Sequence, residues 1–173
     1  MSDTLVTIVA IGLAAVLMFV FPLMTMSDRT DDVSKLTVET ATTEFVDEIR
    51  TTGKITPDKY SKFIENIGST GNTYDVEMEV KVKDENPGKK TTQTAKDKIG
   101  ENVYYSVYTS QIEEKLIANQ DYKLKEGDIV SVDVKNTNQT LSQQLKNFFY
   151  SVVGKDTYTI AASHAGIVTA TGK

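Results

Sequence analysis

The residue types that could support catalysis are few in this chain of 173 residues. His164 is the only histidine, and Ser163 precedes it directly. A serine nucleophile needs a histidine base within hydrogen-bond distance and a carboxylate that orients this base, and two adjacent residues give poor geometry for such a pair. The sequence also contains no Gly-x-Ser-x-Gly elbow and no cysteine. We therefore predict no catalytic residue and no enzymatic activity, and we expect His164 to be an exposed turn residue.

Metal and cofactor chemistry have equally little support. The acidic cluster of Asp28, Asp31 and Asp32 lacks the ligand spacing and the glycine of a calcium-binding loop, so we interpret it as part of a solvated linker beside the membrane. Gly68 and Gly71 are not followed by the lysine and helix of a phosphate-binding loop. We predict no metal and no cofactor. A net charge of −5 also argues against nucleic acid as a partner, because phosphate binding requires a dense basic surface.

The most informative stretch is residues 5–24, LVTIVAIGLAAVLMFVFPLM, which contains no charged residue. As a helix it would be about 30 Å long, which matches the hydrocarbon core of a bilayer. The alternatives are a buried core helix or a cleaved signal peptide. A core helix would normally have a polar face, and a signal peptide would begin with basic residues, which are absent here. We therefore expect residues 1–26 to be a transmembrane anchor in contact with membrane lipid, and residues 27–173 to form one soluble domain.

Small residues interrupt the large apolar ones within this stretch. Ala10 and Ala14 form a small-xxx-small pair, which lets two membrane helices approach closely, and Thr7 could add a weak hydrogen bond between helices. We predict that the residues that pack helices together in a membrane or filament are Thr7, Ala10, Gly12, Ala14 and Ala15. The alternative is a single lipid-facing helix in which the alanines have no partner.

The helical pattern continues beyond the apolar stretch. Apolar residues recur every three or four positions to Arg50, which predicts an amphipathic helix that ends at Gly53. The anchor and this helix would form one rod with a kink at Pro22, because proline removes a backbone hydrogen bond and its ring clashes with the preceding turn. A second helix is expected from Thr56 to Gly68, with the threonine as its N-cap and proline in its first position.

The remaining sequence predicts antiparallel strands and two further helices. Strict alternation of apolar and charged residues over 74–83 indicates a strand with one buried and one solvated face. Shorter strands are expected at 102–108, 130–135, 158–162 and 167–170, with a turn at 163–166 between the last two. Capping boxes at 110–113 and 140–143 predict helix starts, the second helix having its apolar face at Leu141, Leu145, Phe148, Phe149 and Val152 and ending at Gly154. The soluble part is therefore of the α+β class, a small antiparallel sheet with helices on one side.

This layout resembles a type IV pilin: a short polar N-terminus, an uninterrupted apolar helix, a proline at its far end, an amphipathic continuation and a small α+β domain. The segments FVDEIR at 45–50 and TGNTYDVE at 70–77 are similar to single-span proteins associated with tight-adherence (Flp-type) pilus or conjugation-like loci of Gram-positive bacteria. The resemblance implies a cytoplasmic N-terminus, an extracellular domain, and a role as a minor pilin or pilus-assembly component. It implies copies of the same chain or related single-span subunits as partners.

The function hypotheses belong to different classes. The first is a structural, non-enzymatic pilin-like subunit, anchored and assembled through its N-terminal helix. The alternative is a membrane-tethered accessory binding module of a secretion or conjugation machine. The third is a tethered hydrolase, which rests on His164 alone. For the side of the membrane, Arg29 and Lys35 after the span favour a cytoplasmic domain by the positive-inside rule, whereas the resemblance implies an extracellular one, which we expect.

Overall fold

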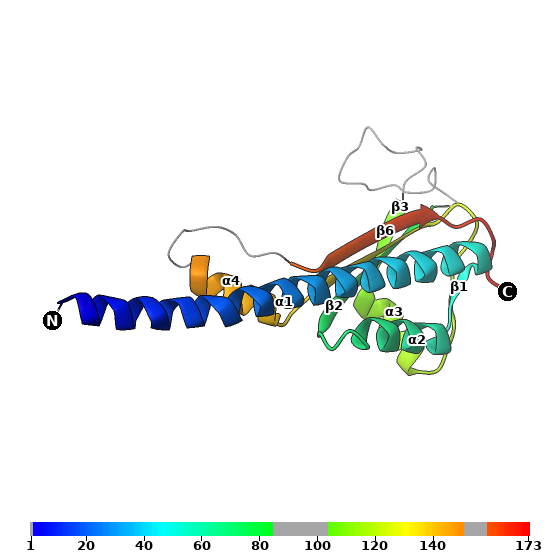
Figure 1. Cartoon of the computed structure of the whole chain (residues 1–173). Coiled ribbons are helices and arrows are strands. Elements are labelled where there is room, and N and C mark those ends of the chain that lie inside the picture. The colour runs from blue at the N-terminus through cyan, green and yellow to red at the C-terminus, as the bar shows by residue number, and fades with distance from the viewer. Residues whose placement is uncertain (1, 85–103, 151–158) are drawn as a thin grey trace, which may run out of the picture.

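The computed structural model describes residues 2–84, 104–150 and 159–173. Its dominant element is α1 (Ser2–Thr52), one uninterrupted helix of 51 residues. The N-terminal half of α1 projects from the folded part, and the C-terminal half lies along an antiparallel sheet (Figure 1). This is the predicted α+β, pilin-like arrangement.

The other elements follow α1 in the order strand, helix, two strands, helix, two strands, helix and strand. They are β1 (Lys54–Ile55), α2 (Pro57–Gly68), β2 (Tyr74–Lys83), β3 (Tyr104–Tyr108), α3 (Thr109–Ile117), β4 (Tyr122–Lys123), β5 (Ile129–Asn136), α4 (Leu141–Tyr150) and β6 (Ala161–Ile167). The main sheet has the order β3-β2-β5-β6, and all its neighbouring strands are antiparallel. The short strands β1 and β4, which the sequence pattern did not predict, pair with each other.

The end of α1 and the start of α2 form as predicted. Gly53 has φ +66°, and its N–H donates to the carbonyl of Ile49, so it ends the helix in the left-handed conformation. A side chain there would also collide with the backbone of Ala170, whose oxygen would lie 2.1 Å from an added Cβ. Thr56 is the N-cap of α2, and its hydroxyl accepts from the N–H of Lys59.

The core lies between α1 and the inward face of the sheet. A stripe of α1 residues at three- and four-residue spacing is fully or nearly fully buried, namely Val38, Ala41, Phe45, Val46 and Ile49. It packs with valines and a methionine of β2 and β5, whose cross-strand pairs include Met78 with Val132 and Val80 with Val130. On α2, Phe63 stacks on Phe45 with ring centroids 4.4 Å apart.

Boundary predictions are wrong at two places in the chain. Residues 163–166 do not form a turn between two strands: β6 runs through them, paired with β5 from Ala161 to Ile167. Small residues in this segment let the strand lie close under α1, and their low hydrophobicity hid the strand pattern. Helix α3 begins at Thr109 rather than after Ser110, because the Thr109 hydroxyl bonds the backbone of Met78 and starts the helix directly beside β2.

Some predicted features fall outside the described residues. These are most of the loop at 84–100, the first residues of the strand at 102–108, and Tyr158 of the strand at 158–162. The predicted end of the last helix at Gly154 also falls there. Within the described part, α4 extends from Leu141 to Tyr150, and its predicted capping box forms: the side chains of Thr140 and Gln143 each accept from the other residue's N–H.

Candidate assembly surface

The N-terminal half of α1 is an apolar rod that is mostly exposed, with Leu17, Val20 and Met24 partly buried. Figure 1 shows it extending away from the domain, and α1 is long and apolar enough, by length and composition, to span a membrane. Twelve large apolar side chains of the rod are 44–76% exposed. They are Leu5, Val6, Ile8, Val9, Ile11, Leu13, Val16, Met18, Phe19, Phe21, Leu23 and Met26. In water, an apolar surface of this extent would be strongly unfavourable.

The five predicted packing residues lie within this rod, but on two faces. At about 100° per residue, Thr7, Ala10 and Ala14 fall within one narrow sector of the helix, whereas Gly12 and Ala15 fall on another side. All five are exposed in the single chain. The hydroxyl of Thr7 donates to the carbonyl of Asp3, so in the single chain its hydrogen bond lies within α1. The structure therefore divides the predicted set, and the Thr7, Ala10 and Ala14 face is the small-residue face.

Pro22 lies inside α1, and the helix continues on both sides of it. The helix also crosses the expected boundary between residues 26 and 27 without interruption. The helix is therefore not broken at Pro22. Whether it bends there stays a prediction.

The prediction that the acidic cluster is a solvated linker is wrong. The cluster belongs to the junction of α1, residues 27–34, which lies between the apolar rod and the half that packs on the sheet. Asp28, Asp31 and Asp32 all lie within α1, and Asp31 is only 5% exposed. Ser27, Asp31 and Ser34 are buried at the same three- and four-residue spacing that continues as Val38, so one stripe of α1 is buried from the junction into the core. The stripe is polar near the rod and apolar over the sheet.

Helix α4 covers the polar part of this stripe. The hydroxyl of Thr140 donates to a carboxylate oxygen of Asp31 over 2.7 Å, the hydroxyl of Ser142 donates to Asp28, and the ammonium of Lys146 lies 2.5 Å from the same Asp28 oxygen. The carboxylates of Asp28 and Asp31 therefore both have hydrogen-bond partners on α4 or at its N-cap. The Lys146 ammonium and the Ser142 hydroxyl together hold the pKa of Asp28 below its ordinary value of 3.8.

The junction could not be found from local spacing alone, because its two sides are more than one hundred residues apart in the sequence. One indication was present in the sequence: the spacing of Asp28 and Asp31 puts both carboxylates on the same side of a helix. Nothing in the sequence indicated that the capping box at 140–143 would lie beside them.

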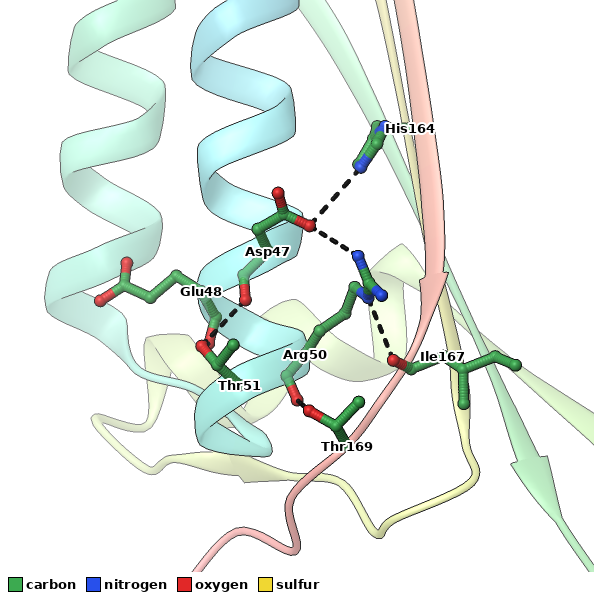
Figure 2. A network of polar contacts seen from close by, with 7 residues as sticks. All are labelled: Asp47, Glu48, Arg50, Thr51, His164, Ile167 and Thr169. Atoms are coloured by element: carbon green, nitrogen blue, oxygen red, sulfur yellow. Dashed lines mark hydrogen bonds and ion pairs between the residues drawn. The ribbon is translucent and has the colours of Figure 1, made fainter.

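A second polar contact joins the other end of α1 to β6 (Figure 2). The guanidinium of Arg50 pairs with Asp47 over 2.7 Å, and its Nε donates to the carbonyl of Ile167 over 3.0 Å. Gly166 leaves room for the Arg50 side chain, since an added Cβ would lie 2.4 Å from it. The backbone N–H of Thr169 donates to the carbonyl of Arg50, which is an end group of the helix. This network fastens the end of α1 to the sheet.

The position of His164 corrects the expectation of an exposed turn residue. It lies in β6, half-buried, on the face turned toward α1, and its Nε2 is 3.7 Å from Oδ1 of Asp47. Ser163 is the preceding residue of the same strand, so its side chain points to the opposite face. The two residues therefore do not form a nucleophile and base pair. Among the described residues, no group of three potential ligands could hold a metal ion.

Comparison of the chain with protein-family models, curated proteins and solved structures found no match.

Proposed function

We propose that this chain is a structural, non-enzymatic pilin-like subunit or pilus-assembly component. Its N-terminal helix would anchor it in a membrane and then pack against neighbouring helices in an assembly. The observation that carries the proposal is the apolar rod, which is continuous with the helix at the centre of the domain core. A rod of this kind needs an apolar environment, and both lipid and a bundle of similar helices provide one.

The continuity of α1 supports an assembly role over a simple tether. A tether requires only a flexible linker between anchor and domain. Here the same helix forms the rod and supplies Phe45, Val46 and Ile49 to the core, so the orientation of the rod fixes that of the domain. Rigid coupling is useful where subunits must stack in register. The partners under this proposal are membrane lipid, copies of the chain and related single-span subunits.

The small-residue face gives the direct test. We expect Ala10→Leu combined with Ala14→Leu to reduce contact between chains, because the added side chains hold helix backbones apart. Contact is measured as the yield of disulfide-linked dimers through Thr7→Cys in native membranes, which is practical because the chain has no cysteine. Val9→Leu combined with Val16→Leu adds apolar volume on the opposite face and is the matched control. A chain that stays monomeric in membranes before and after the change would contradict the proposal.

A second candidate is an accessory binding module, and the outward face of the sheet favours it. No described helix covers this face, where a shallow hollow is lined by both acidic and basic side chains, among them Asp75, Glu77, Asp133 and Lys135. A photo-crosslinker at Ser163, which borders the hollow, distinguishes the candidates. A binding module would be captured by a different protein at Ser163 and give no dimer at Thr7; an assembled subunit would give the dimer.

The domain is extracellular under this proposal. The test is labelling of Ser61→Cys, an exposed position on α2, with a membrane-impermeant maleimide. Labelling on intact cells equal to that after lysis would support an extracellular domain. Labelling only after lysis would place the domain in the cytoplasm, as the two basic residues after the span favour.

A further inference from the structure

The two edge strands of the main sheet, β3 and β6, lack the residues that usually prevent an edge from pairing with another chain. In the order β3-β2-β5-β6, no other strand of the described residues lies beyond either of them. Protected edges typically carry lysine, proline or inward-pointing charges. β6 has the sequence Ala-Ala-Ser-His-Ala-Gly-Ile, and β3 has the sequence Tyr-Tyr-Ser-Val-Tyr. The charged side chains of the outward face lie on the central strands instead, as Glu77 and Asp133 do.

The backbone of β6 turns hydrogen-bonding groups to the free edge. Just beyond this strand, the N–H of Val168 donates to the carbonyl of Asp128, which precedes β5. Because alternate residues of an antiparallel strand bond to one neighbour, the even-numbered residues of β6 bond to β5 and the odd-numbered ones face the edge. The carbonyl of Ile167 agrees with this direction, since it accepts from the guanidinium of Arg50. The earlier odd-numbered residues of β6 remain to pair with another strand.

The same alternation applies to β3. The N–H and the carbonyl of Met78 both bond to the hydroxyl of Thr109, just beyond the end of β3, so the even-numbered residues of β2 bond in the direction of β3. Their partners in β3 are odd-numbered. The N–H of Tyr108 points away from β2, where it donates to the side chain of Gln111. The residues of β3 whose backbone faces the edge are Tyr104, Ser106 and Tyr108.

The directions of the two edges allow copies of the chain to continue the sheet. The sheet has four strands and all neighbours are antiparallel, so β3 and β6 run in opposite directions. β6 points away from the apolar rod (Figure 1). Copies anchored in one membrane have parallel rods, so β6 of one copy and β3 of the next would meet as antiparallel strands. Two copies of β6 would instead meet as parallel strands, which pair slightly less stably.

The side chains of the two edges also differ in size in a complementary way. On the outward face, β6 carries the small residues Ala161, Ser163 and Ala165. On the same face, β3 carries Tyr104 and Tyr108, which are 39% and 59% exposed. The edge-facing residues of both strands have their side chains on this face, so the rings of one copy would lie over the small residues of the next. Aromatic side chains that cover small residues across a strand pair stabilise the pairing.

We propose that copies of this chain join edge to edge, with β6 of one subunit pairing with β3 of the next to extend the antiparallel sheet. This inference rests on the proposed assembly of copies anchored in one membrane, and it adds a contact between their domains. The contact joins two different surfaces, so each added copy leaves one edge of each kind open for a further copy.

The spacing of the strands separates this contact from packing of the rods. Four strands at about 4.8 Å put equivalent points of joined copies about 19 Å apart, whereas packed helices lie roughly 8–10 Å apart. The rods of two edge-paired copies therefore do not touch each other. The small-residue face of the rod packs with a different neighbour.

The test uses full-length protein in native membranes. Ser106→Cys combined with Ser163→Cys places one thiol on each edge, in a chain that has no cysteine of its own. A disulfide forms where the two Cα atoms lie within about 7 Å. Ala161→Cys and Ala165→Cys each replace Ser163→Cys in turn, to cover the neighbouring registers. The matched control combines Ser106→Cys with Ser131→Cys, which lies on the same outward face but on the central strand β5.

We expect one of the three edge pairs to give a series of dimers, trimers and longer linked products, and the control pair to give none. Lysine at whichever of Ala161 and Ala165 is not linked should remove the series, because it puts a charge at the edge. Ser131→Lys adds the same charge on the central strand and should leave the series intact. An unchanged circular dichroism spectrum shows that each variant is folded.

The other outcomes overturn the inference in distinguishable ways. If Thr7→Cys dimers form but no edge pair links copies, the rods assemble without strand pairing and the proposed function stands. If neither link forms, the chain is monomeric in membranes and the proposed function fails as well. Linkage through Ser163→Cys alone would show that β6 pairs with itself. Linkage of Ser163→Cys to a different protein would show that the edge binds another partner.

Discussion

The two halves of α1 are one helix in two environments. Residues 38–49 bury one stripe and leave polar side chains on the other side, which is the pattern of a helix that packs on a sheet. Residues 5–24 are apolar on every side, and most of their large side chains are exposed. The same apolar residue types therefore have opposite exposure: Phe45 is 4% exposed and Phe19 is 76% exposed.

The difference shows that the domain alone does not explain the sequence of α1. Folding of this chain accounts for the C-terminal half, because its large side chains fill the core. Packing among the described residues does not account for the N-terminal half, whose large side chains stay exposed. The buried polar residues Ser27, Asp31 and Ser34 lie between the exposed apolar half of α1 and the half that packs on the sheet.

The largest expected effect comes from removing a core ring. Phe45→Ala should lower the free energy of unfolding by about 3–5 kcal/mol, because it leaves a cavity beside Phe63. Phe19→Ala removes the same ring from the rod and should change it by less than about 0.5 kcal/mol. Denaturant unfolding in detergent measures both. Equal effects would mean that the rod packs against the domain in solution.

The next effect is on membrane retention. Leu13→Lys places a charge at the centre of the proposed span and should disfavour insertion by about 2.5–3.5 kcal/mol. Leu36→Lys changes a leucine of similar exposure in the domain half of α1 and should leave insertion unaffected. Flotation of membranes from cells measures the retained fraction. Loss of retention with Leu36→Lys as well would contradict the division of α1 into two environments.

A smaller effect is expected at the junction. Asp31→Ala removes the acceptor of the Thr140 hydroxyl and leaves a buried polar group without that partner, at a cost of about 1–3 kcal/mol. Asp32→Ala changes the exposed neighbour and is the control. Hydrogen exchange of α4 amides reports the loss directly, because α4 should open before the sheet does. Unchanged protection of α4 would show that the bond between Thr140 and Asp31 does not hold the helix in place.

The smallest effect depends on pH. Because the folded-state pKa of Asp28 lies below the unfolded value of 3.8, its contact with Lys146 and Ser142 stabilises the fold above that pH. This contribution should disappear as the pH falls through the lower folded-state value, and it amounts to less than about 1 kcal/mol for a pair that water still reaches. The difference in unfolding midpoint between the wild type and Asp28→Asn, present at neutral pH, should vanish in acid. A difference that persists would assign the effect to something other than the charge.

Much of the fold followed from local patterns in the sequence. Alternation over 74–83 predicted β2 within its observed bounds, and Gly53 and Thr56 marked the end of α1 and the start of α2. These features depend on residues close in sequence, where backbone preference and burial pattern agree. The candidate packing residues were predicted in the same way, and their positions in the continuous helix α1 place them on two faces.

The features that were missed depend on contacts between distant segments. β6 is a strand because β5 pairs with it, although its small residues give little alternation. Asp28 and Asp31 are held by contacts with α4 and its N-cap, which are far away in the sequence. His164 faces α1 because of the register in which β6 pairs with β5. From local sequence alone, an isolated acidic cluster is predicted to be exposed to solvent, because most charged residues are exposed.

The fastening of the C-terminal end of α1 has a mechanical meaning for a subunit held by its rod. Tension along α1 would reach the sheet through contacts that lie side by side with β6, so the Arg50 bond to Ile167 and the Thr169 bond to Arg50 would resist it together in shear. Parallel bonds loaded in this direction must break at once rather than one after another. The end of the helix farthest from the rod would therefore share a pulling force with the contacts of Asp28 and Asp31 near the rod.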